Sequence, residues 1–119
     1  MIDFRKTLVR ELSTLGLPVY YELFLTQDTK TPCISYMLAG DVSEATGDTL
    51  GYSSVSFYIK IWATTVADIA SYSTKIDNKM RELGFRRTGA TELWLDGIGQ
   101  NQLRYTGLAQ EYFNKGDTE

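Results

Sequence analysis

The residue types that carry most enzyme and metal chemistry are scarce in this chain. It has 119 residues, with no histidine and a single cysteine, Cys33. Without histidine there is no imidazole general base, no Ser-His or Cys-His nucleophile pair and no histidine metal ligand. One cysteine also excludes a disulfide scaffold within the chain, and we expect it to be a small buried hydrophobe. The composition therefore predicts a protein that is not an enzyme and that needs no cofactor or metal.

Carboxylates are the other groups that could perform chemistry. The segment Gly40–Gly51 holds Asp41, Glu44 and Asp48. Catalysis by two carboxylates would require such acids to converge in a cleft. Here glycine, serine and threonine residues separate them, and their order does not match an EF-hand calcium loop. We expect a long, flexible acidic loop rather than an active site.

Aromatic and basic residues indicate a protein interface instead. In the segment Tyr52–Ala63 the polar and aromatic positions alternate with apolar ones, so that they lie on the strand face opposite the core. Aromatic side chains on such a face are typical of protein interfaces. The alternative is that the chain's own loops cover this face. The candidate interface residues are Tyr58, Lys60, Trp62, Arg86, Arg87 and Arg104.

The elements that must position these residues follow from periodicity. Apolar residues at helical spacing predict one helix over 3–15, ending at Gly16, and another over 66–83, capped by Thr64 or Thr65 and ending at Gly84. Aromatic and β-branched runs predict five strands, with a turn over 96–101 joining the last two. The expected strands are 19–24, 33–39, 52–63, 85–95 and 103–113.

This order of helix, three strands, helix and two strands predicts an α+β fold, in which two helices pack on one face of an antiparallel sheet. We expect a single domain over residues 1–113 and a polar tail over 114–119. The formal net charge is −3, and the 12 basic residues are scattered, which argues against specific nucleic-acid binding. No stretch has the length of apolar sequence that a membrane span or signal peptide requires, so we expect a soluble protein made in the cytoplasm.

The pattern as a whole resembles the tail terminator and tail-completion proteins of long-tailed bacteriophages, including the tail-to-head joining group. The matching pieces are the helix 4–15, the strand 57–63 (FYIKIWA), the helix through Ile69-Ala70-Ser71 and the segment 103–107 (LRYTG). The likeness covers most of the chain, and it rests on element order and hydrophobic pattern rather than on a catalytic signature.

The resemblance implies a structural virion protein at the head-tail interface. Such a protein forms a ring, usually a hexamer, that caps the tail tube, ends tail growth and offers a docking surface to the head. Its implied partners are copies of itself, the tail tube protein and a head-completion or neck protein, with DNA only passing through the lumen. In such a ring the acidic loop with Asp41, Glu44 and Asp48 would line the lumen, where it would repel DNA, or contact the tube. Two alternatives remain open: a head-completion or neck adaptor protein, and a small non-catalytic α+β domain that binds a ligand or another protein.

Overall fold

The computed structural model describes residues 5–22, 29–44 and 52–108. These residues form two helices and five strands in the order that the sequence predicted. The helices are α1 (Arg5–Ser13) and α2 (Val66–Glu82), and the strands are β1 (Val19–Tyr21), β2 (Cys33–Glu44), β3 (Tyr52–Ala63), β4 (Arg86–Leu95) and β5 (Ile98–Leu108).

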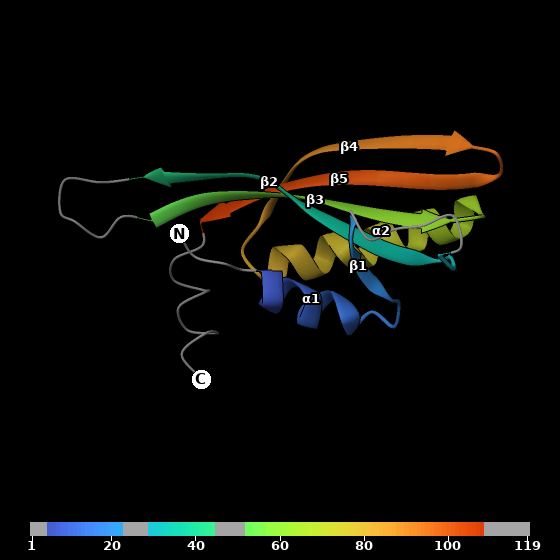
Figure 1. Cartoon of the computed structure of the whole chain (residues 1–119), viewed down its shortest axis with the longest axis horizontal. Coiled ribbons are helices and arrows are strands. Elements are labelled where there is room, and N and C mark those ends of the chain that lie inside the picture. Colours follow the sequence, from blue (N-terminus) through green and yellow to red (C-terminus); the bar gives the residue numbers. More distant parts are fainter. Residues whose placement is uncertain (1–4, 23–28, 45–51, 109–119) are drawn as a thin grey trace.

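The five strands make one sheet in the order β1-β2-β3-β5-β4, and both helices lie on the same face of it (Figure 1). The predicted α+β class is therefore confirmed. The sheet is mixed rather than wholly antiparallel, because β1 pairs with β2 in parallel, with Val19 opposite Ile34. β1 and β2 therefore run in the same direction. The prediction of an antiparallel sheet was wrong for this pair.

The core lies between the sheet and the two helices. Alternate residues of β3 (Val55, Phe57, Ile59 and Ile61) point toward the helices and are buried, as their spacing predicted. α1 contributes Leu8 and Leu12 to the same cluster, and α2 contributes Ile69, Ile76 and Met80. No helix of the described residues covers the other face of the sheet.

Capping residues fix the helix ends. Thr65 is the N-cap of α2, where its side-chain oxygen accepts a hydrogen bond from the amide of Asp68 at 3.1 Å. Gly84 follows the helix with φ +90°, and Gly16 follows α1 with φ +87°. A residue with a side chain is strained in this region, which explains why glycine ends each helix.

Two hairpin connections are shorter than predicted. β2 continues through Gly40 to Glu44, where Asp41 pairs with Val55 and Glu44 with Tyr52, so this part of the expected acidic loop is strand. The hydrogen-bonded pairing of β2 with β3 continues past a β-bulge after Leu38, although residues 40–44 are mostly polar. Asp48 lies outside the described residues.

At the other hairpin, Leu95 already pairs with Ile98, so the turn is only Asp96-Gly97 rather than the whole of 96–101. Both turn residues have positive φ, at 53° and 80°, as a tight two-residue hairpin turn requires. β5 is described as far as Leu108, so the end of the last predicted strand, the domain boundary at 113 and the polar tail fall outside the described residues.

Candidate interaction surfaces

The outer face, meaning the face of the sheet opposite the helices, carries Tyr58, Lys60 and Trp62, as the alternation in β3 predicted. All three side chains are half-buried. The indole of Trp62 donates a hydrogen bond to the hydroxyl of Ser35 at 2.9 Å. The ammonium of Lys60 forms an ion pair with Glu22 and lies 5.7 Å from the centre of the Trp62 ring. Part of this face is therefore occupied by the chain itself.

The three candidate arginines do not form one patch. Arg104 is the cross-strand neighbour of Tyr58, and its guanidinium carbon lies 5.8 Å from the centre of that ring. Arg86 pairs with Thr106 and so belongs to the outer face as well. Arg87 pairs with Tyr105, whose side chain is buried on the helix side, and Arg87 accordingly turns toward α2.

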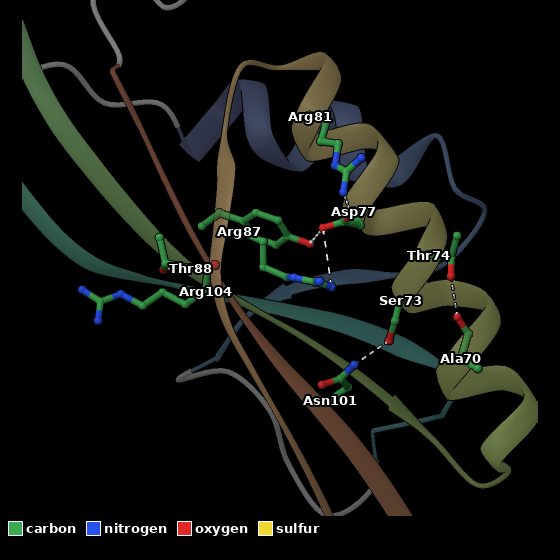
Figure 2. Close-up of polar contacts among 10 residues, drawn as sticks. Ala70, Ser73, Thr74, Asp77, Arg81, Arg87, Thr88, Asn101 and Arg104 are labelled. Atoms are coloured by element: carbon green, nitrogen blue, oxygen red, sulfur yellow. Dashed lines mark hydrogen bonds and ion pairs between the residues drawn. The ribbon is translucent and has the colours of Figure 1, made fainter.

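A buried carboxylate on α2 is the centre of a polar cluster that joins helix and sheet (Figure 2). Asp77 accepts a hydrogen bond from the hydroxyl of Tyr105 at 3.0 Å on one oxygen, while Arg81 lies 3.1 Å from the other. Arg87 approaches the first oxygen to 3.9 Å. Burial, and then the hydrogen bond to Asp77, raise the pKa of Tyr105 above its ordinary range. The cluster holds α2 against β5.

Asp77 was not among the residues that the sequence predicted to belong to a site. The signal was present, because Asp77 follows the buried Ile76 and lies within the apolar stripe of α2. A charged residue at such a position requires a partner on the facing element.

A depression with a volume of about 480 Å³ lies between the end of α2 and the start of β4, and we call it the arginine corner. Its lining consists of Arg81, Gly84, Phe85, Arg86 and Arg87. The positive φ of Gly84 turns the chain sharply enough to bring the end of the helix beside the start of the strand. Arginines from two different elements therefore border one depression, with Arg81 and Arg87 on the helix side of the sheet and Arg86 on the outer face.

The apolar end is the end of the fold at the β4–β5 turn, away from the arginine corner. It contains all the large exposed hydrophobic residues found among those described. Leu95 is 71% exposed, Val66 is 67% exposed and Leu93 is 54% exposed. Trp94 and Ile98 complete the set. Trp94 pairs with Gly99 and Gly99 with Ala63, three residues before Val66, so the strand positions and the start of α2 lie at one end of the fold (Figure 1). None of these five residues was among the predicted interface residues.

Groups suited to covalent or metal chemistry do not converge in the described part of the chain. Cys33 is buried as expected, and burial raises the pKa of its thiol, which keeps the sulfur protonated. Among the described residues no three histidine, cysteine, aspartate or glutamate side chains are grouped so as to hold a metal ion. None of the described helices has both the length and the apolar character needed to cross a bilayer.

Comparison with known proteins does not assign the chain to a family. No protein-family model matches it, and no curated protein matches it. The surfaces described above are therefore the basis for a functional proposal.

Proposed function

We propose that this protein is a structural subunit of a long-tailed phage, and that copies of it form a ring that caps the tail tube and receives the head. The proposal rests on the resemblance in element order and hydrophobic pattern, together with the apolar end. The observation that carries it is that the described large hydrophobic residues with high exposure lie at one end of the fold, four of them in the β4–β5 hairpin and Val66 at the start of α2.

An exposed apolar cluster of this kind is typical of a surface that another protein covers. A closed ring requires a head-to-tail contact, in which two different patches of each subunit meet. The apolar end supplies the first patch. We assign the second to the part of the outer face around Tyr58, whose ring is half-buried, because Trp62 is level with Leu93 through Gln100 and so adjoins the first patch.

The edge strand β4 adds directional contacts to the apolar ones. Every residue of β4 is exposed, and its backbone pairs with β5 on one side only in the described part of the chain. An unpaired strand edge is a template for hydrogen bonds to another chain. A neighbouring subunit that covers the apolar end would also reach this edge.

The test measures the mass of the protein by light scattering over a wide concentration range, with and without purified tail tubes, followed by negative-stain imaging of the mixture. We expect rings, or binding confined to one end of the tube. Leu95→Asp places a charge in the apolar end and should abolish ring formation and end binding. Ser71→Asp, which adds the same charge at an exposed position of α2, is the matched control and should change neither.

Several outcomes contradict the proposal. A protein that remains monomeric at high concentration and ignores tube ends is not a tail terminator. Binding to purified heads rather than to tube ends would favour the neck adaptor. Loss of assembly in both charge variants would show that the apolar end has no special part in it.

A further inference from the structure

The arginine corner contains more positive charge than its own surroundings neutralise. Arg81, Arg86 and Arg87 line the depression, and Asp77 is the one acidic side chain that forms a described ion pair with any of them. Lys79 and Glu82 at the end of α2 pair with each other at 3.4 Å and add no net charge. Arg81 and Arg87 face the carboxylate of Asp77 on the helix side, and Arg86 borders the depression from the outer face, so the three arginines carry a formal surplus of two positive charges.

The donors of these arginines are largely free to bind a ligand. Asp77 is buried, and it is already bonded to Tyr105 and Arg81. The 3.9 Å between Arg87 and Asp77 exceeds hydrogen-bonding distance, so Asp77 orients Arg87 without using its donors. Arg86 makes no described ion pair, and the side chains of Arg81 and Arg87 are 70% and 48% exposed.

We propose that the arginine corner is a binding site for paired carboxylates on an acidic segment of a partner protein. The planar guanidinium group binds a carboxylate with two parallel hydrogen bonds, which gives both charge and direction. The volume of about 480 Å³ admits several side chains. This inference concerns the start of β4 rather than its apolar end, and peptide binding is measured separately from ring formation, so it does not depend on the proposed ring.

The rest of the surface favours an acidic protein segment over nucleic acid. Duplex binding requires basic residues that follow the phosphate backbone over many positions. β4 beyond the corner has no further basic residue, and it ends in the apolar end about 30 Å away, at the usual rise per residue of a strand. The chain as a whole is acidic, with a formal charge of −3. The positive charge of the corner is therefore local and suits a short ligand.

The test measures the anisotropy of a fluorescent hexaglutamate peptide titrated with the full chain at low salt. We expect saturable binding that weakens with rising salt and that hexaglutamine does not reproduce. Arg86→Ala should weaken binding roughly fivefold, as expected for loss of one charge-assisted contact of about 1 kcal/mol. Arg10→Ala, which removes one exposed arginine on α1, is the matched control and should leave binding unchanged. Arg81→Ala should weaken binding like Arg86→Ala.

Thermal unfolding of each variant separates binding from folding, and Arg86→Ala should unfold at the same temperature as the parent because its side chain makes no described ion pair. The proposal is overturned if hexaglutamate does not bind, or if Arg10→Ala weakens binding as much as Arg86→Ala. A short DNA duplex that binds more tightly than the peptide, with the same dependence on Arg86, would overturn the choice of an acidic protein segment. Since ring formation is measured separately, either proposal can fail without the other.

Discussion

β4 and β5 are the two strands of one hairpin, but their environments are opposite. β5 lies between β3 and β4, and on its helix side Leu103 and Tyr105 are fully buried. Every residue of β4 is exposed, including Leu93, Trp94 and Leu95. Leu93 and Leu95 lie on the outer face, because Leu93 pairs with Gln100 and Gln100 with Trp62, whereas Trp94 lies on the helix side at the edge and remains 38% exposed. An apolar strand residue therefore belongs to the core only where a helix covers both its strand and its face of the sheet.

The largest expected effect comes from truncating one leucine on each strand. Leu103→Ala on β5 removes a fully buried side chain and leaves a cavity, and it should lower the free energy of unfolding by about 3 kcal/mol. Leu93→Ala on β4 should change it by less than about 0.5 kcal/mol, because the side chain is mostly exposed. Urea unfolding of the monomer measures both. Equal losses would mean that β4 is buried in solution and that the contrast between the strands is wrong.

The hydroxyl of Tyr105 provides the next test. Tyr105→Phe removes its hydrogen bond to the buried Asp77, and it should cost about 1.5 kcal/mol at pH 7. The pKa of Tyr105 is raised in the folded protein, so the unfolded chain loses this proton first as the pH rises above about 10. The stability that the hydroxyl contributes is therefore complete below that pH and is lost as the pH rises toward the folded value.

The cost of Tyr105→Phe should accordingly shrink between pH 9 and pH 11, as measured by urea unfolding at each pH. Tyr72→Phe on α2, where no hydrogen bond of the hydroxyl is described, is the control and should show little cost at any pH. A cost of Tyr105→Phe that stays constant up to pH 11 would contradict the coupling between this hydroxyl and Asp77.

A smaller effect concerns the contact that joins the two strands at the apolar end. The ring of Trp94 on β4 lies over Gly99 on β5, where an added Cβ would come within 2.6 Å of the ring. Gly99→Ala should therefore displace the indole, shift the fluorescence of Trp94 in a Trp62→Phe background and cost about 1 kcal/mol. Gly89→Ala on β4 has no atom within 4 Å of the added carbon, and it should leave the fluorescence unchanged. Identical spectra for both variants would place the indole elsewhere.

The smallest expected effect compares one threonine on each strand of the outer face. The hydroxyl of Thr106 on β5 lies 2.8 Å from that of Ser56 on β3. Thr106→Val breaks this contact and should cost about 0.5 kcal/mol in thermal or urea unfolding. Thr91→Val on β4, where no side-chain hydrogen bond is described, should be neutral or slightly stabilising, because valine favours strands. A greater loss from Thr91→Val would indicate a hidden contact at the edge.

The sequence predicted those elements whose residues carry their own signal. Alternation alone gave both ends of β3, and Gly16 and Gly84 marked the helix ends because each adopts a positive φ that other residues avoid. Leu8 and Leu12 were placed on the buried face of α1 by helical spacing. These features depend on local conformation and on one face being apolar.

Features that depend on a partner strand were not predictable in this way. Gly40–Glu44 is polar and contains a glycine, yet it is strand because β3 continues beside it. The parallel pairing of β1 depends on the path that the chain takes between Tyr21 and Cys33, which local propensity does not determine. The arginines were predicted as one group with Tyr58 and Trp62, but the bulge near Gly89 and the alternation of β4 send Arg86 and Arg87 to different sides.

The central position of β3 has a consequence for the exchange of backbone amides with deuterated solvent. β3 is hydrogen-bonded to β2 on one side and to β5 on the other, so its amides exchange only when the whole sheet opens. On β4, alternate amides point away from β5, and in the described part of the chain no strand lies beyond them. Deuterium should thus enter these outward-pointing amides of β4 within seconds and β3 orders of magnitude later, and their slow exchange at high protein concentration would show that another chain covers this edge.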